Sequence, residues 1–501
     1  MTMSMLLAIT QSGIPAIPTG TMRDLQLVAP ELLVAGGAMS LLMLGVILGE
    51  WSGRVIRQLS VLLLLVAGAI AWTTAPEAPR YAFDGAFVVD PLSVFAKVLI
   101  TISAAAGLLL SGAYLRNEKI DRFEYPVIIV LATLGMMVMV SARDLITMYM
   151  GVEMQSLALY VLAAFNRDSL RASEAGLKYF VLGALSSGLL LYGASLAYGF
   201  AASTQFADIA LYAGALDGPD LGLIFGMVFI ACGLAFKVSA APFHMWTPDV
   251  YEGAPTPVTA FFAAAPKLAA MVLFVRVLVD PFGAMHDDWS PIIAAMAVLS
   301  MLIGAFGALA QRNIKRLMAY SSIANMGYAL VAVSASSARG VEGMLVFMTI
   351  YLVSTIGIFA CILAMRRREG MVESIDDLAG LSKTHPGLAV ALTALVLSIA
   401  GIPPLAGFLG KFWVFVPAVE SGATWLVVVA VLASVVSAFY YLRIVKLMWM
   451  ETTEHPLSVA PRELALIASV TALAVFPLMM LPFVFSEGLG AISAAADGLF
   501  Q

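Results

Sequence analysis

The chain has 501 residues, of which 61% are hydrophobic and only 12% are charged, whereas about a quarter of an average soluble domain is charged. A water-soluble fold lacks the interior to hide so much apolar surface, so an integral membrane protein is predicted and nucleic-acid binding is excluded. The formal net charge of −5 says little, because charges in a membrane protein lie in loops and their placement matters more than their sum.

The first twenty residues lack a basic region and contain scattered prolines, so no cleaved signal peptide is expected. Beyond them, fourteen segments are apolar over the roughly 20 residues that a membrane-spanning helix needs. In chain order the predicted spans are 25–48, 56–75, 92–115, 125–142, 144–164, 173–200, 221–243, 258–279, 290–310, 315–336, 341–365, 387–416, 421–449 and 463–484. An all-α, multi-pass fold with about fourteen transmembrane helices is therefore predicted.

The loops between these spans predict the topology. Loops after odd-numbered spans hold seventeen lysines and arginines, and loops after even-numbered spans hold three, namely Arg80, Arg143 and Arg339. The loop after the seventh span holds none. Because basic residues collect on the cytoplasmic side of a membrane, both chain termini are predicted on the outer side.

Six lysines and arginines and two glutamates stand out within the apolar spans, where a charge at the helix centre costs about 2.5–3.5 kcal/mol. They are, in chain order, Glu31, Lys97, Glu153, Lys178, Lys237, Lys267, Arg276 and Lys411. Lys97 lies within two turns of its helix start and Arg276 lies near a helix end, so both side chains are expected to snorkel to the membrane interface. Glu31 lies near the outer end of the first span.

Glu153 in the fifth span and Lys267 in the eighth lie near mid-membrane, and Lys178 lies about a turn and a half into the sixth. Such charges either form static ion pairs that hold helices together or carry protons. Lysine suits proton transfer, because desolvation lowers its pKa and a nearby carboxylate raises it again. Movement of Glu153 towards or away from Lys178 or Lys237 would then load or release a proton.

Two spans are interrupted. The seventh runs into Phe236–Pro242 and the twelfth contains the sequence from Gly401 to Lys411, which includes two prolines. Proline removes a backbone donor and clashes with the preceding turn, so helices break there. Broken backbone at membrane depth is tolerated only where it lines protein or water. Lys237 and Lys411 flank these breaks, and Lys267 follows Pro266, where a further local break is expected.

The two broken spans lie five apart, which is an odd number. If spans four to eight and nine to thirteen are equivalent units, the second enters the membrane from the opposite side, so two inverted five-helix repeats are predicted. The predicted organisation is three N-terminal helices in residues 1–124, a first repeat in 125–279, a second in 280–449, and a last helix with a tail in 450–501.

Two further stretches are secondary candidates. His244 begins a polar, proline-rich sequence that is either a proton uptake region or an ordinary interfacial loop with an aromatic anchor. At the start of the tenth span, Tyr320, Ser321 and Ser322 either carry hydrogen-bonded water or serve polar helix packing.

Four motifs carry a resemblance to a known family. They are Pro242–Asp249, Gly253–Pro257, Lys315–Ser322 and the Gly401–Lys411 break, and they resemble the antiporter-like membrane subunits of respiratory complex I, the proton-pumping NADH-quinone oxidoreductase. The resemblance extends from about the third to the thirteenth span. It is closest to the N-type subunits, because M-type subunits would carry glutamate at Lys411 and L-type subunits would continue into a long lateral helix.

The resemblance implies roles for five residues. Glu153 would be the modulating carboxylate paired with Lys178 or Lys237, Lys267 would link two half-channels, and Lys411 would pass the proton outward. It also implies a bacterial inner membrane with both termini on the periplasmic side, and other membrane-arm subunits as partners, further antiporter-like ones included.

No cofactor is expected in this chain, and NADH, FMN, iron–sulfur clusters and quinone would belong to partner subunits. Cys232 and Cys361 agree with this, because each is isolated in an apolar segment that offers neither a disulfide nor a metal or cluster site.

The function predicted is proton translocation, as a subunit of NADH:quinone oxidoreductase with no redox chemistry of its own. One alternative is a subunit of a multi-subunit sodium/proton antiporter of the same fold. Another is a structural membrane subunit whose buried charges only hold helices together.

Overall fold

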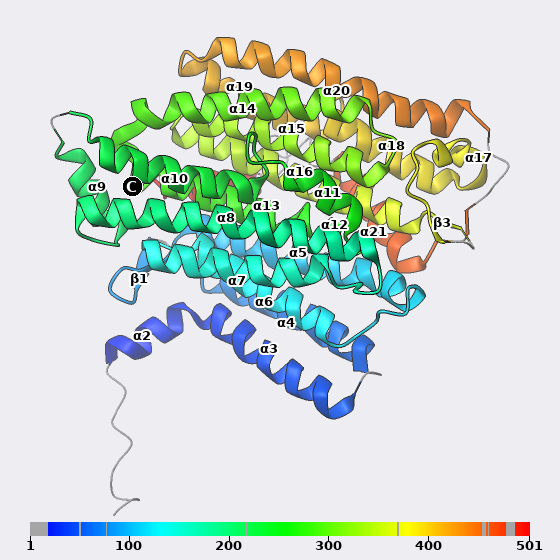
Figure 1. Cartoon of the computed structure of the whole chain (residues 1–501), viewed down its shortest axis with the longest axis horizontal. Coiled ribbons are helices and arrows are strands. Elements are labelled where there is room, and N and C mark those ends of the chain that lie inside the picture. Colours follow the sequence, from blue (N-terminus) through cyan, green and yellow to red (C-terminus); the bar gives the residue numbers. More distant parts are fainter. Residues whose placement is uncertain are drawn as a thin grey trace, which may run out of the picture.

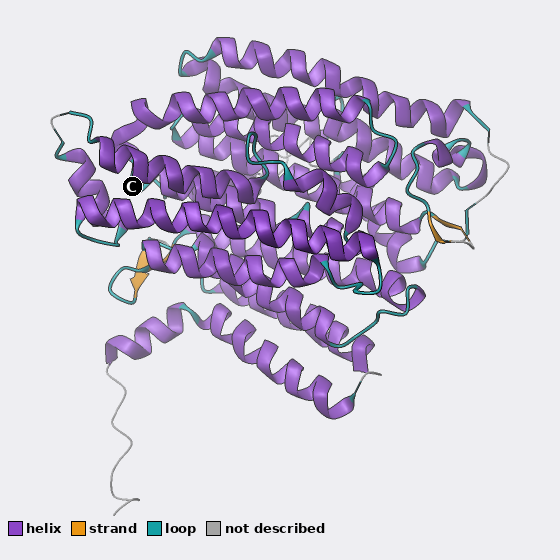
Figure 2. Ribbon diagram, in the orientation of Figure 1, coloured by secondary structure: helices purple, strands orange, loops and turns teal. Residues whose placement is uncertain are grey.

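The computed structural model describes residues 19–49, 52–76, 78–216, 218–367, 370–452, 457–458, 460–476 and 486–500. Long α-helices make up most of it, and they lie side by side with their axes roughly aligned, as Figure 1 shows. Two small antiparallel hairpins mark the opposite ends of this bundle, as Figure 2 shows. At one end β1 (Arg80–Ala82) pairs with β2 (Phe87–Val89), and at the other β3 (Arg366–Arg367) pairs with β4 (Gly370–Met371).

The helices follow one another along the chain, and some predicted spans are divided between two of them. In the first half they are α2 (Thr19–Leu27), α3 (Ala29–Leu48), α4 (Gly53–Thr73), α5 (Pro91–Asn117), α6 (Glu124–Val140), α7 (Leu145–Ala163), α8 (Leu170–Ala201), α9 (Phe206–Gly214), α10 (Leu221–Val238), α11 (Trp246–Gly253), α12 (Thr256–Phe262) and α13 (Ala265–Val279). In the second half they are α14 (His286–Leu309), α15 (Ile314–Ser334), α16 (Ala338–Ala364), α17 (Leu381–Thr384), α18 (Pro386–Ala400), α19 (Ala406–Glu420), α20 (Thr424–Met450), α21 (Arg462–Ala474) and α23 (Ser486–Asp497).

The predicted spans agree with these helices. Among the described residues, 11 helical segments are long and apolar enough to cross a membrane, and α6 and α18 are shorter apolar helices. These coincide with the first thirteen predicted spans. Of the fourteenth, α21 covers the beginning, and 477–484 lie outside the described residues. Residues 1–18 also lie outside the described residues, and the expectation about a signal peptide falls on them.

Both predicted breaks are confirmed. The helix α10 ends at Val238, where Ser239 takes a left-handed conformation with φ 65°, and α18 ends at Ala400, where Gly401 does the same with φ 85°. A left-handed residue ends a helix, and the prolines that follow prevent its continuation. The eighth span is also divided, between α12 and α13, just before Pro266.

The middle of the bundle is formed by α12, α13, α15 and α16. Over its most apolar stretch, the segment Thr256–Val279 is entirely buried, whereas only 28% and 33% of the residues are buried along the corresponding stretches of α3 and α20. Buried charges in the central helices must therefore find partners inside the protein.

Close approach of helices depends on small residues: a Cβ added to Gly135 of α6 would lie 2.5 Å from the backbone nitrogen of Gln155 in α7.

Both described ends of the chain lie at the β1–β2 end of the bundle. Asp24 of α2 accepts a hydrogen bond from the backbone nitrogen of Phe83, at 3.2 Å, and Leu499 and Phe500 line a pocket together with Tyr81. An even number of membrane crossings places two ends on one side in this way. That this side is periplasmic, and that 125–279 and 280–449 are inverted repeats, stay predictions.

Candidate functional site

Glu153 lies inside the bundle on α7. The helix starts at the N-cap Asp144, whose carboxylate accepts hydrogen bonds from the backbone nitrogens of Ile146 and Thr147 at 2.7 and 3.1 Å. Glu153 is half-buried, and its Oε1 accepts a short hydrogen bond from the Ser187 hydroxyl on α8. The carboxylate therefore lies between α7 and α8.

Lys237 of α10 is buried against α7, one helical turn further along α7 than Glu153. Only 6% of the residue is exposed, and its Nζ donates to Ser156 Oγ at 2.7 Å. Ser156 in turn donates to the Val152 carbonyl at 2.6 Å. Because Ser156 follows Glu153 by three residues, the two side chains leave α7 about 4.5 Å apart along its axis. Through its hydrogen bond to Ser156, Lys237 thus lies one helical turn of α7 away from Glu153.

Lys267 of α13 reaches the end of the helix that carries Lys237. It is 1% exposed, and its Nζ donates to the carbonyl oxygen of Val238 at 3.4 Å. Val238 is the last residue of α10, and the carbonyls of a last helical turn have no partner within their helix. The Tyr251 ring lies 5.6 Å from the same ammonium. Lys267 therefore holds the carbonyl end of the helix whose last residue but one is Lys237.

Lys411 of α19 has the same arrangement at the second break. It is 5% exposed, and its Nζ donates to the Ala400 carbonyl at 2.8 Å and to Ser434 Oγ of α20 at 2.7 Å. Ala400 ends α18, so a cation again lies at the negative end of a half-helix. The Tyr328 ring lies 4.7 Å from Lys411 Nζ.

The structure does not bring Lys178 to Glu153. Lys178 Nζ lies 2.8 Å from Glu174 Oε1 and 2.8 Å from Asp249 Oδ2, and 42% of its side chain is exposed. Ser187, which contacts Glu153, follows Lys178 by nine residues on α8, a rise of about 13 Å. That exceeds the reach of a lysine side chain, so the pairing of Glu153 with Lys178 is wrong for this structure. No ion pair joins Glu153 to Lys237 either among the described residues, and Ser156 lies between them.

The snorkelling prediction for Lys97 and Arg276 is wrong, since both are only 2% exposed. Lys97 Nζ lies 2.8 Å from Glu31 Oε1, and Arg276 Nη2 donates to both carboxylate oxygens of Asp90 at 2.9 and 2.8 Å. Neighbouring helices cover these span ends, so the cations are paired within the protein instead of reaching water. Sequence reasoning missed Asp90, although an acid directly before a proline at a helix start is a typical N-cap.

The stretch after His244 is a helix rather than an interfacial loop. Trp246, the expected interfacial anchor, is buried, stacks on Tyr179 at 4.4 Å between ring centroids, and donates its indole N–H to the Phe236 carbonyl at 3.1 Å. His244 itself is half-buried at the break, and burial lowers its pKa. Its role in proton uptake stays a prediction.

The hydroxyls at the start of α15 join helices directly. Ser322 shares a hydrogen bond with Tyr351 of α16 at 2.7 Å, and Ser321 shares a shorter one with Tyr441 of α20. Tyr320 is half-buried on the same turn. Polar helix packing, one of the two predicted uses, is therefore what these serines do in this structure.

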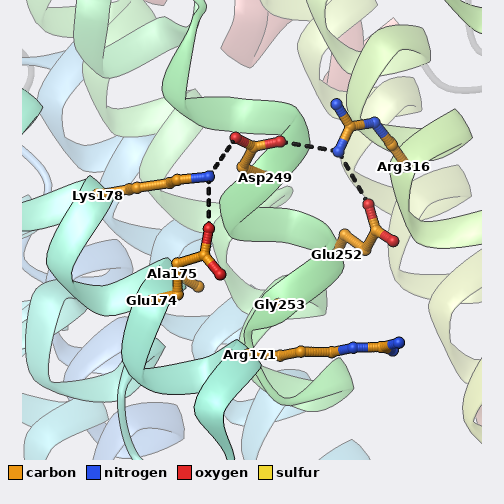
Figure 3. A pocket seen from close by; sticks show the side chains of 8 residues that line it. All are labelled: Arg171, Glu174, Ala175, Lys178, Asp249, Glu252, Gly253 and Arg316. Carbon is orange, nitrogen blue, oxygen red and sulfur yellow. Dashed lines mark hydrogen bonds and ion pairs between the residues drawn. The ribbon is translucent and has the colours of Figure 1, made fainter.

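A cluster of charges at the β3–β4 end was not predicted as a unit. Figure 3 shows it: Asp249 lies between Lys178 and Arg316, and Glu252 contacts the same Arg316 nitrogen as Asp249. Arg316 Nη1 donates to Asp249 Oδ1 at 2.8 Å and to Glu252 Oε2 at 2.9 Å. These residues line one pocket with Arg171 and Glu174. In the sequence, topology alone explains the basic residue Arg316 at the start of the tenth span, and only the fold shows which acids it contacts.

Neither cysteine lies in a ligand cluster. Cys232 of α10 and Cys361 of α16 are free thiols on different helices. Within the part of the chain that the structure describes, no group of three or more His, Cys, Asp or Glu side chains is placed to hold a metal ion.

Comparison with known proteins agrees with this architecture. The family described as "NADH:quinone oxidoreductase/Mrp antiporter, TM" matches residues 142–437. The chain is 60% identical to NADH-quinone oxidoreductase subunit N of Maricaulis maris, over 91% of this chain and 95% of the relative, and 55% identical to subunit N 1 of Rhizobium meliloti, over 95% and 98%.

Solved structures show the same fold. A chain of respiratory complex I from Thermus thermophilus is 32% identical, with a TM-score of 0.80 over 93% of this chain and 99% of that one. A chain of the Mrp complex from Dietzia has a TM-score of 0.84 over 95% and 98%, but its 22% identity shows likeness of fold alone. The chain therefore belongs to the NADH:quinone oxidoreductase/Mrp antiporter family of membrane proteins and, within it, to the NADH-quinone oxidoreductase subunit N family.

Proposed function

We propose that this chain translocates protons across the bacterial plasma membrane, driven by NADH:quinone electron transfer in the other subunits of complex I. One observation carries the proposal. Lys267 donates to the carbonyl end of α10, one residue beyond Lys237, and Lys411 donates to the carbonyl end of α18. Three buried lysines thus lie at two helix breaks, with Glu153 one turn from the serine that holds Lys237.

The chemistry of these contacts suits reversible protonation. Burial disfavours an ammonium, whereas carbonyl and hydroxyl acceptors and a nearby carboxylate favour it, so a small change in these contacts moves a proton on or off the amine. Arginine would stay charged throughout. Among the residues that the structure describes, each of the three lysines has only uncharged acceptors within hydrogen-bond reach, at 2.7 to 3.4 Å. The charged state is therefore supported without being locked by an ion pair.

Buried hydroxyls near the lysines support a hydrated route between the two breaks. The hydroxyls of Tyr251 and Tyr328, whose rings face Lys267 and Lys411, have no hydrogen-bond partner among the described residues. Buried polar groups of this kind are ordinarily satisfied by ordered water. In this proposal a proton passes from Lys237 to Lys267 and on to Lys411, which releases it on the periplasmic side, where both termini lie.

Replacement of Lys237 tests the proposal. In inside-out vesicles that contain the whole complex, Lys237→Met should leave the complex assembled but lower both NADH oxidation and the protons moved per NADH. Lys97→Met is the matched control, because Lys97 is an equally buried lysine outside this route, paired with Glu31. It should lower the amount of assembled complex and leave the proton stoichiometry unchanged. Normal stoichiometry in an intact Lys237→Met complex would contradict the proposal.

The same experiment separates the structural alternative, in which Lys237→Met would impair assembly as Lys97→Met does. The antiporter alternative rests on the fold shared with the Mrp complex chain. Mild-detergent purification of the chain with its partners distinguishes it. Flavin and iron–sulfur absorbance in the purified assembly supports the complex I proposal, in which NADH, FMN, the clusters and quinone belong to partner subunits. Their absence from an intact assembly supports an antiporter.

A further inference from the structure

The short helix α11 has one water-facing side and one buried side. Asp249 and Glu252 lie in the pocket at the β3–β4 end, where their side chains are 34% and 31% exposed. Trp246 and Tyr251 are buried on the other side, against Tyr179 and Lys267. Any movement of α11 would therefore change contacts both in the aqueous pocket and beside the buried lysines.

Asp249 ties this helix to two others. Its Oδ2 accepts a hydrogen bond from Lys178 on α8, and its Oδ1 accepts one from Arg316 on α15, each at 2.8 Å (Figure 3). Burial acts to raise the pKa of Asp249, but the hydrogen bonds and charges of Lys178 and Arg316 outweigh it and hold the pKa below its ordinary value. Asp249 thus stays ionised near neutral pH. We call Lys178, Asp249 and Arg316 the Asp249 bridge.

An aromatic stack lies between this bridge and Lys237. Tyr179 directly follows Lys178, and its ring lies parallel to that of Trp246, with 13° between the ring planes. Phe236 directly precedes Lys237, its ring lies 5.5 Å from that of Trp246, and its carbonyl accepts the Trp246 indole N–H. Tyr179, Trp246 and Phe236 therefore separate the half-exposed ion pairs from the first buried lysine.

We propose that Asp249 is a positioning residue that holds α11 against α8 and α15, keeps the Tyr179–Trp246–Phe236 stack closed, and thereby controls contact between Lys237 and water at the β3–β4 end. The inference rests on the proposed function, since it concerns access to the lysines of that route. Partly exposed ion pairs are individually weak, so the Asp249 bridge is a contact that can open during turnover. The buried Arg276–Asp90 pair, at 2% and 3% side-chain exposure, is not of this kind.

Hydrogen exchange in the assembled complex tests the bridge independently of activity. Asp249→Asn removes the charge that both cations contact, so amides in 236–253 should exchange about tenfold faster. Glu252→Gln is the matched control: it lies on the same helix, contacts the same Arg316 and has similar exposure, but it does not contact Lys178. Its exchange should rise by about twofold at most. Asp249→Glu, which keeps the charge, should restore most of the protection.

Passive proton leak tests the stack. In proteoliposomes without NADH, Asp249→Asn should leak protons faster than the wild type, and Glu252→Gln and Asp249→Glu should not, a pattern that a general loss of stability would not produce. Unchanged exchange in 236–253 would overturn the bridge, and faster exchange without added leak would overturn the stack as the barrier. If Asp249→Asn does not assemble, Lys178→Met, which removes one of the two contacts, is measured against the same criteria. Normal proton stoichiometry in Lys237→Met would instead defeat the proposed function and leave the exchange result standing.

Discussion

Lys411 Nζ lies 2.8 Å from the carbonyl oxygen of Ala400, the last residue of the half-helix that precedes it. Lys267 makes the corresponding contact with Val238 at the other break, at 3.4 Å. In both places a buried amine replaces the partner that the helix end lacks. The helix breaks and the buried lysines are therefore parts of one arrangement, and changes to either should affect proton movement.

Lys411→Arg tests whether this position needs a group that loses its proton. Arginine retains a positive charge and donors for Ala400 and Ser434, but it does not deprotonate in proteins. We expect an assembled complex whose protons per NADH are lowered and whose NADH oxidation falls about tenfold, since a difference of 1.4 kcal/mol in the barrier already has that effect. Proton pumping in inside-out vesicles is the measurement. Wild-type pumping with arginine at 411 would mean that the charge serves structure alone.

Ser156→Ala tests the acceptor of Lys237. Loss of a hydrogen bond to a buried charged group costs about 1–3 kcal/mol, which favours the neutral amine. The alkaline limb of the pumping profile should therefore move to lower pH by about one unit, because one unit corresponds to about 1.4 kcal/mol. Ser334→Ala is the control, since among the described residues the Ser334 hydroxyl bonds only to Val331 of its own helix. An unshifted profile would show that Ser156 is no partner of Lys237 during turnover.

Gly401→Ala tests the fit of the second break around Lys411. A Cβ at Gly401 would lie 2.9 Å from Lys411 Cδ, and the backbone there has φ 85°. Gly422 has the same φ of 85° but nothing within 4 Å of a Cβ, so Gly422→Ala imposes the same backbone strain of about 1 kcal/mol without touching Lys411. Both variants should lower the thermal stability of the complex, and only Gly401→Ala should lower the number of protons pumped per NADH oxidised. Equal pumping in the two variants would argue against a demanding fit at Lys411.

Asp90→Asn tests the buried pair with Arg276. Breaking a buried pair typically costs about 3–5 kcal/mol, so the thermal stability of the complex should fall markedly. Burial acts to raise the pKa of Asp90, but Arg276 and the hydrogen bonds of Ser93 together outweigh it and the pKa is lowered. The stabilisation is thus present above the unfolded carboxyl pKa of about 3.9 and is lost as pH falls through the lower folded pKa.

The difference in stability between wild type and Asp90→Asn should accordingly be constant near neutral pH and shrink below about pH 4. Asp280→Asn is the comparison, because Asp280 pairs with Arg143 at 18% and 24% side-chain exposure and should matter by about 1 kcal/mol or less. A similar loss of stability in Asp90→Asn and Asp280→Asn would show that burial of the Arg276–Asp90 pair adds nothing to its contribution to stability.

Much of the architecture follows from one-dimensional patterns. Apolar length predicts the spans because only a helix of about 20 residues satisfies its backbone across a bilayer. Proline at Pro242 and Pro403, together with Gly401, predicts the two breaks. The five positions Glu153, Lys178, Lys237, Lys267 and Lys411 stand out because a charge is costly wherever lipid would surround it.

The sequence alone thus determined where the spans lie, where two of them break and which charged residues lie within them. Only the tertiary structure decided their partners. It turned Lys97 and Arg276 from interfacial residues into buried pairs with Glu31 and Asp90, and it moved Lys178 from Glu153 to Asp249. Distance along one helix is set by a fixed rise per residue, but which helices meet depends on packing against many neighbours, and no local pattern specifies that.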